Sequence, residues 1–279
     1  MNLKTLLESK LTEKQMESLR TSFDIIGDVA VIEIPEELRN KEKEIAKALI
    51  KTHSHVMTVC KKLGGRKGTK RLRDFEVIFT KKVVTPMQTI HKEHGCLFKL
   101  DVSKTYFSPR ESTERLRIAE KVKPGEKILV MFGGIAPLPI MIAKKQGGTK
   151  KIYSVEINPD ATMYARENVV LNNVIENIVT VEGDVKDFCK KIREKFDRIL
   201  MPLPEQAYKY LDSAFLCCKK GGIIHLYGIS KEKRLFKDLE KKIERRARES
   251  KRKIKIVDRK KVLPYRPREW KVCIDFEVK

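Results

Sequence analysis

The chain has 279 residues, of which 41% are hydrophobic and 35% are charged, and 61 basic residues against 38 acidic ones give a formal net charge of +23. This length provides one large domain or two modest ones with ample material for a core. The charge favours a polyanionic partner, above all nucleic acid, because the alternative, a densely charged heat-stable surface, raises Lys and Glu together. The six scattered cysteines form no CxxC pair, and the N-terminus resembles no signal peptide. We therefore expect a cytoplasmic protein without membrane contact.

The first hundred residues predict a small α+β module. Residues 1–20 have leucines at helical spacing and predict one amphipathic helix. A strand at 28–34, a helix reaching residue 50 and short strands at 75–79, 87–91 and 96–102 follow. The run Lys61–Arg73 contains seven basic residues, three glycines and no acid, which predicts an exposed loop. Such a loop suits a phosphate backbone, although a merely solvated loop is the alternative.

Strands and helices alternate from Lys127 onward. Strands are expected at 128–132, 152–156, 178–182, 198–201 and 222–227, with clear helices at 160–171 and 206–218 between them. A basic helix ending near residue 250 precedes two last strands, 254–257 and 271–278. This alternation predicts a mostly parallel, doubly wound α/β sheet. Seven strands with a final hairpin are the Rossmann-like arrangement of class I methyltransferases. We expect an RNA-gripping module at 1–104 and this catalytic domain at 105–279.

The segment Lys127–Asn158 predicts a cofactor site. It reads as a strand, a turn with Gly133 and Gly134, a helix from Pro137 and a second strand that ends on Glu156. Glycines let a backbone approach a ligand, and an acid about 20 residues on is where a ribose diol is usually held. The GxGxxG fingerprint of dinucleotide sites is absent, so S-adenosylmethionine fits better, with an ordinary βα turn as the alternative.

Further polar or rigid residues follow the later strands, where ligands bind in an open sheet. Asp184 could accept a hydrogen bond from an adenine amino group, or it could simply cap the next helix. The prolines of Met201–Pro204 make a stiff wall against which a flat base could lie. The expected cofactor contacts are Phe132, Gly133, Gly134, Ile135, Glu156, Ile157, Asp184, Val185, Met201 and Leu203.

Several stretches resemble a known family, the archaeal and eukaryotic tRNA guanine-37 N1-methyltransferases. They are VSKTYFSPRESTERLRI, EINPDA, DRILMPLP, GGIIHLYGISK and PYRPREWKVCIDF, in this order, and the similarity covers residues 1–279. The resemblance implies S-adenosylmethionine as methyl donor, a tRNA anticodon stem-loop as substrate and a monomer. A further N-terminal domain that many members carry is expected to be absent. The wyosine-pathway branch of the same superfamily is a close competitor.

The resemblance also implies roles for individual residues. Glu114 matches the general base that removes the N1 proton, although an acid among arginines is usually a surface ion-pair network. Arg71 matches the arginine that stabilises negative charge on the guanine carbonyl oxygen. The residues expected around the target base are Tyr106, Arg110, Arg115 and Pro204, with Pro202 in the catalytic loop. No metal is expected, because His53, His55, His91, His94 and Cys96 meet no standard spacing.

Two departures from the family pattern leave alternatives open. Val130 stands where the family usually has Asp, and Pro202 stands where it has Asn, so no side-chain amide orients the guanine edge. Methylation of carbon 7 of a tricyclic wyosine precursor at the same position is therefore an alternative. Aminocarboxypropyl transfer ranks third, because the enzymes that catalyse it lack the arginine matched by Arg110. A catalytically silent RNA-binding protein is the alternative outside enzymes.

Overall fold

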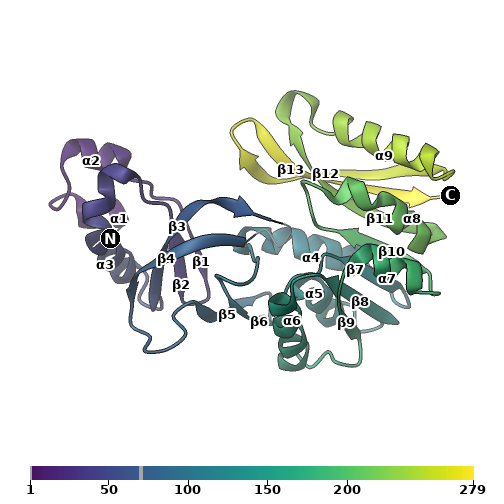
Figure 1. Ribbon diagram of the computed structural model, residues 1–279, viewed down its shortest axis with the longest axis horizontal. Coiled ribbons are helices and arrows are strands. Elements are labelled where there is room, and N and C mark those ends of the chain that lie inside the picture. Colours follow the sequence, from purple (N-terminus) through teal and green to yellow (C-terminus); the bar gives the residue numbers. More distant parts are fainter. Residues whose placement is uncertain (1, 69–71) are drawn as a thin grey trace. The chain divides into compact units, whose positions relative to one another are not determined.

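The computed structural model describes residues 2–68 and 72–279. The chain divides into two compact units, Met1–Pro109 and Arg110–Lys279 (Figure 1). The described helices include none long and apolar enough to cross a membrane.

The first unit is an α+β module, as predicted, built on a four-stranded sheet of order β1-β2-β3-β4 with a separate two-stranded ribbon β5-β6. Its helices pack on the sheet through a core that includes Leu7, Leu38 and Leu49. The elements are α1 (Leu3–Leu7), α2 (Glu13–Ser18), β1 (Phe23–Ile26), β2 (Val29–Ile32), η1 (Glu36–Lys41), α3 (Glu42–Thr52), β3 (Thr58–Lys67), β4 (Leu72–Thr80), β5 (Gln88–Glu93) and β6 (Cys96–Asp101).

Two predictions for this unit were wrong. The predicted helix over residues 1–20 is divided into α1 and α2, because Thr12 and Gln15 form a capping box that begins a new helix at Glu13. The described part of the basic run Lys61–Arg73 is largely strand rather than loop, since β3 extends to Lys67 and pairs with β4, which begins at Leu72. Backbone hydrogen bonds need no apolar side chains, and Lys61 is neutralised by ion pairs to Glu42 and Glu76.

The second unit contains a seven-stranded sheet of order β12-β13-β11-β10-β7-β8-β9, which confirms the predicted class I methyltransferase fold. All neighbours are parallel except β13, which runs antiparallel to β11 and β12. The strands are β7 (Lys127–Met131), β8 (Lys151–Glu156), β9 (Ile178–Glu182), β10 (Phe196–Met201), β11 (Cys218–Lys231), β12 (Ile254–Arg266) and β13 (Glu269–Val278). The strand order reverses beside β7, the point at which open α/β sheets bind ligands.

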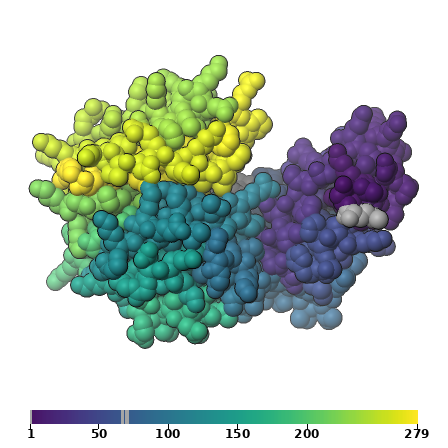
Figure 2. Space-filling model, turned by 180° about the vertical axis from the view of Figure 1, so that it is seen from behind, coloured from purple at the N-terminus to yellow at the C-terminus, as the bar shows by residue number. Residues whose placement is uncertain are grey.

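The helices of this unit fall into two groups. α4, α5 and α6 pack in succession, while α7, α8 and α9 share a buried core with β10, β11 and β13. The C-terminal strands (yellow in Figure 2) lie against the region of α4, to which ion pairs from Lys121 to Asp258 and Asp275 join them. The helices are η2 (Pro109–Glu111), α4 (Ser112–Lys121), α5 (Pro137–Lys145), α6 (Pro159–Leu171), α7 (Val185–Lys191), η3 (Ala207–Tyr210), α8 (Leu211–Cys217), η4 (Glu232–Arg234) and α9 (Lys237–Glu249).

Candidate active site

The turn that follows β7 has an unusual backbone. Phe132, Gly134 and Ala136 have positive φ angles of 61°, 57° and 64°, and α5 begins directly afterwards at Pro137. Two of these residues carry side chains that disfavour the left-handed region, and such strain concentrates at functional sites. Glu156, at the end of β8, accepts a hydrogen bond from the Gly134 N–H at 2.8 Å. The structure therefore brings together the glycine turn and the acid, as expected for a cofactor site.

Gly133 is needed for a reason other than ligand approach. A Cβ on Gly133 would lie 2.0 Å from Ser154 Oγ of β8, far inside ordinary contact. The Ser154 hydroxyl is buried and has no hydrogen-bond partner among the described residues. Gly133 thus allows the turn to lie against the neighbouring strand, which sets the position of Gly134 and its N–H.

Residues from three strand ends meet at this edge of the sheet. The Phe132 ring lies edge-on to Tyr210 of η3, with the ring centroids 4.9 Å apart, and Lys186 of α7 lies over the same tyrosine at 5.0 Å. Burial, followed by the charge of Asp184, raises the pKa of Tyr210. Asp184 also accepts from the Lys186 N–H at 2.6 Å, so the helix-cap alternative for this residue is confirmed. Tyr210 was not predicted from the sequence, although an aromatic residue soon after Met201–Pro204 is a usable signal.

These residues fit S-adenosylmethionine. The Glu156 carboxylate is fixed by the N–H groups of Gly134 and Asn158, in an orientation suited to a ribose diol. The neighbouring Ile157 is apolar yet 44% exposed, which suits a face for the adenine ring. The predicted contacts Ile135, Val185 and Met201 are fully buried, so only their backbones could face a ligand. Pro202 and Leu203 are half-buried, and Pro204 is buried.

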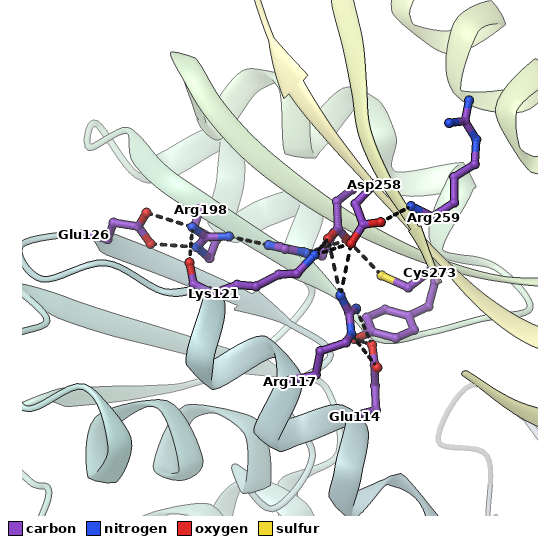
Figure 3. Close-up of polar contacts among 11 residues, drawn as sticks. Glu114, Arg117, Lys121, Glu126, Arg198, Asp258, Arg259 and Cys273 are labelled. Atoms are coloured by element: carbon purple, nitrogen blue, oxygen red, sulfur yellow. Dashed lines mark hydrogen bonds and ion pairs between the residues drawn. The ribbon is translucent and has the colours of Figure 1, made fainter. Parts of the chain in front are cut away.

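Glu114 lies buried on α4 and is held by three hydrogen bonds (Figure 3). Arg117 donates from Nε to Oε2 at 2.7 Å and from Nη2 to Oε1 at 2.6 Å. Tyr227 of β11 donates its hydroxyl to Oε1 at 2.6 Å. Burial, followed by the neighbouring Cys273 and Glu114, raises the pKa of Tyr227 well above its ordinary value, so the phenol remains a donor. Glu114 therefore does form an ion pair, as the alternative prediction had it, but the pair is buried rather than part of a surface network.

Asp275 of β13 accepts hydrogen bonds from four side chains. Its Oδ2 accepts from Lys121 Nζ at 2.7 Å and from Arg117 Nη1 at 3.5 Å. Its Oδ1 accepts from His225 Nδ1 at 2.7 Å and from the Cys273 thiol at 3.2 Å. Burial alone would raise the pKa of Asp275, but the hydrogen bond from His225 and the cations Lys121 and Arg117 outweigh it, so the pKa is lowered. Arg117 therefore lies among three carboxylates, those of Glu114, Asp275 and the more exposed Asp258, whose Oδ2 is 3.8 Å from Arg117 Nη1.

His225 continues this network to the buried Arg198. Arg198 Nη1 lies 2.6 Å from His225 Nε2, and a guanidinium can only donate, so Nε2 accepts. The ring proton is then on Nδ1, facing Asp275, and the imidazole is neutral, in agreement with a pKa that burial lowers. Glu126 balances Arg198 with two hydrogen bonds, of 2.6 and 2.8 Å. His225, Cys273 and Asp275 are close enough to hold a metal ion. Both ring nitrogens already have partners, however, and three cations surround the group, so the site does not favour one.

Of the other predicted residues, Arg71 lies outside the described residues. Tyr106, in the first unit, lines a cavity of about 80 Å³ together with Asp24, Lys62 and Arg73. Arg110 is exposed, and Arg115 is buried on α4. Sequence analysis gave no role to Arg117, although its spacing of three residues from Glu114 on a helix predicts a contact. Tyr227 and Asp275 lie more than a hundred residues away from Glu114 and could not have been found from local spacing.

Comparison with known proteins identifies the family. The model of the TRM5/TYW2 methyltransferase domain matches residues 89–257, and that of the TYW2 N-terminal domain matches residues 3–80. The chain belongs to the TRM5/TYW2 methyltransferase family. This confirms the resemblance found in the sequence. S-adenosylmethionine, the predicted cofactor, is the one this family uses.

Individual relatives of this TRM5/TYW2 member differ in their named activities. The tRNA (guanine(37)-N(1))-methyltransferase Trm5b of Pyrococcus abyssi is 38% identical over 260 residues, covering 93% of this chain and 76% of the relative. The tRNA 4-demethylwyosine(37)-methyltransferase Taw21 of Saccharolobus solfataricus is 36% identical over 226 residues, covering 81% and 83%.

Solved structures agree with the family assignment. The crystal structure of P. abyssi Trm5b superposes with a TM-score of 0.86 at 37% identity, covering 97% of this chain and 78% of that one. Methanocaldococcus jannaschii TYW2 in complex with AdoMet superposes with a TM-score of 0.68 at 26% identity, covering 92% and 99%.

Proposed function

We propose that this protein is a tRNA methyltransferase that transfers the methyl group of S-adenosylmethionine to N1 of guanosine at position 37, beside the anticodon. The observation that carries the proposal is the buried carboxylate of Glu114, held by three hydrogen bonds on the first helix of the catalytic domain. The similarity to P. abyssi Trm5b and the net charge of +23, which attracts a polyanion, support it. The anticodon stem-loop is the proposed binding partner of a monomeric enzyme.

The residues divide the chemistry among them. Guanine N1 is a weak acid, so its methylation needs a base within hydrogen-bond reach, and Glu114 takes this role. Arg71 stabilises the negative charge that develops on the carbonyl oxygen. Tyr106, Arg110 and Arg115 hold the base, which must first leave its stack. S-adenosylmethionine supplies the methyl group as a sulfonium, held by the turn at Phe132–Ile135 and by Glu156 and Asp184.

A second candidate, methylation of carbon 7 of the wyosine precursor at the same position, is favoured by one observation. Pro202 offers no side-chain amide to orient the edge of a guanine. The similarity to Taw21 and the match to the TYW2 N-terminal domain support this candidate as well.

The test is methyl transfer from labelled S-adenosylmethionine to two tRNA substrates, followed by mass spectrometry of the nucleosides. One tRNA carries unmodified guanosine at position 37, and the other carries the tricyclic precursor. N1-methylguanosine from the first substrate supports the proposal. Methylation of the second substrate alone supports the wyosine candidate, and an aminocarboxypropyl adduct would reveal the third reaction. No product from either tRNA, despite binding of both, would indicate a silent RNA-binding protein.

A further inference from the structure

The hydrogen bonds around Glu114 use its oxygen atoms unequally. A carboxylate offers about four lone-pair positions, two on each oxygen. Oε1 accepts from both Arg117 Nη2 and the Tyr227 hydroxyl, so both of its positions are filled. Oε2 accepts only from Arg117 Nε, and no second donor reaches it among the residues described here. One acceptor position therefore remains, on Oε2.

Asp275, the second carboxylate beside Arg117, has no such opening. Lys121 and Arg117 donate to its Oδ2, while His225 and Cys273 donate to its Oδ1. These four donors fill its acceptor positions, and its side chain is only 3% exposed. The thiol of Cys273 stays protonated, because burial, followed by the charge of Asp275, raises its pKa well above the ordinary value. Of the two carboxylates, only Glu114 has room for a proton.

We propose that Tyr227 and Asp275 are positioning residues for the base, which leave Glu114 Oε2 as the single proton acceptor and keep Arg117 neutralised throughout the reaction. Tyr227 fills the last position on Oε1 and so restricts proton transfer to Oε2. Asp275 remains ionised and gives Arg117 a permanent counter-ion. When Glu114 accepts the proton and loses its charge, the buried guanidinium still has a partner, which avoids an unpaired charge in the interior.

This inference rests on the proposed function and specifies its proton transfer. The N1–H bond of the substrate breaks, and an O–H bond forms at Oε2. The electron pair left on N1 forms the bond to the methyl group, and the pair of the broken sulfur–carbon bond stays on sulfur. The proton afterwards passes from Oε2 to solvent. Arg117 cannot carry it, since a guanidinium has no acceptor atom.

The residues around the Tyr227 ring are consistent with a hydroxyl donor that is held in place. Lys271 Nζ lies 4.9 Å from the centre of the Tyr227 ring and pairs with Glu111 at 2.8 Å. In the ladder of β11 and β13, Tyr227 lies opposite Cys273, and His225 lies opposite Asp275. The two positioning residues therefore come from adjacent cross-strand pairs on one face of the sheet.

The first test is Tyr227→Phe, which removes the hydroxyl and keeps the ring. We expect the single-turnover rate of methyl transfer at saturating tRNA and S-adenosylmethionine to fall about tenfold or more, as for the loss of a hydrogen bond to a charged group. In the profile of rate against pH, the acid limb should move to higher pH, while KM for tRNA and for S-adenosylmethionine stays unchanged. The matched control is Tyr153→Phe, which removes a tyrosine-to-glutamate hydrogen bond to Glu194 elsewhere in the domain and should leave rate and profile unchanged.

The second test is Asp275→Asn, with Asp197→Asn as its control, since Asp197 binds Lys219 and the Lys127 N–H outside this network. We expect a loss of methyl-transfer rate and an altered pH profile in Asp275→Asn but not in Asp197→Asn. Circular dichroism verifies that all variants are folded. If the wild type is active and both Tyr227→Phe and Asp275→Asn keep its rate and its pH profile, this inference is refuted and the proposed function is not. A wild type that methylates neither tRNA refutes the proposed function and this inference with it.

Discussion

Replacing Gly133 by alanine should destabilise the catalytic domain through one defined clash. The backbone of Gly133 lies outside the positive-φ region, so alanine brings no dihedral strain. Its new Cβ, however, would lie 2.0 Å from Ser154 Oγ, whereas ordinary contact begins at 3.4 Å. Strand β8 is held by β7 and β9 on its two sides, so the backbone of Ser154 cannot retreat, and even its Cβ lies only 3.3 Å from the new atom. We expect a loss of about 1–3 kcal/mol in the free energy of unfolding, the usual range for overpacking a core.

The same geometry predicts a rescue. Ser154→Ala removes the clashing atom and leaves the Ser154 Cβ position, at 3.3 Å, as the nearest neighbour. By itself this change should be close to neutral, because it deletes a buried hydroxyl without a described partner. The double variant Gly133→Ala/Ser154→Ala should therefore recover most of the lost stability, with a coupling energy of about 1 kcal/mol or more.

Urea unfolding followed by circular dichroism gives the four free energies of this cycle, and calorimetry measures the affinity for S-adenosylmethionine. Affinity should fall with Gly133→Ala and return in the double variant, because Gly133 sets the position of the Gly134 N–H that binds Glu156. A Gly133→Ala variant as stable as the wild type would refute the reasoning. The reasoning would also be refuted if Gly133→Ala cost as much unfolding free energy in the Ser154→Ala background as in the wild type, because the strain would then lie elsewhere.

Three further predictions concern single residues. Glu114→Gln should lower the methyl-transfer rate by about 10²-fold or more while tRNA affinity, measured by filter binding, stays within a factor of a few; a fully active variant would exclude Glu114 as the base. Asp184→Ala should cost about 1 kcal/mol of unfolding free energy through loss of the α7 cap, and Asp184→Asn clearly less, since asparagine also caps. Equal losses in the two variants would contradict that role. Folding lowers the pKa of His225 and of Asp275, so stability should fall on acidification, first below about pH 6.5 and again below about pH 4. His225→Gln should flatten the first phase in unfolding experiments at constant ionic strength, and an unchanged slope between pH 6.5 and 5 would show that another group is responsible.

Strands β7 to β10 were predictable because they are short, largely apolar runs separated by turn and helical patterns. β11 and β12 extend through basic residues well beyond the predicted 222–227 and 254–257, because antiparallel pairing with β13 continues there. The order of those strands follows from the class I methyltransferase pattern. The first unit was harder, since local capping and pairing decide its details. Thr12 divides the N-terminal helical pattern in two, and the strand β3 carries a basic sequence whose charges are neutralised by acids elsewhere in the chain.

The contact between the glycine turn and Glu156 was predictable for a related reason. Its residues follow successive parallel strands, and the carboxyl ends of such strands share one edge of the sheet. The identity of Glu114 came from the family resemblance, but its surroundings did not. No local pattern connects residue 114 with Tyr227 or Asp275. A second reason for Gly133 could not be predicted, because only the structure shows that Ser154 lies where its Cβ would be.

The surroundings of Glu114 connect the proposed base to β13, the last strand of the sheet in chain order. Glu114 and Arg117 lie on the helix that opens the catalytic domain, whereas Asp275 lies four residues from the end of the chain. Asp275 reaches His225 and Arg117 only because β13 pairs with β11 in a register that sets residue 275 opposite residue 225. A slip of one residue would turn Asp275 to the other face of the sheet and leave Arg117 with Glu114 and with Asp258, whose side chain is 46% exposed and lies 3.8 Å away. The register of the C-terminal hairpin therefore determines whether the guanidinium beside Glu114 has a second buried counter-ion. If Glu114 is the base, as proposed, catalysis and completion of the sheet depend on the same strand.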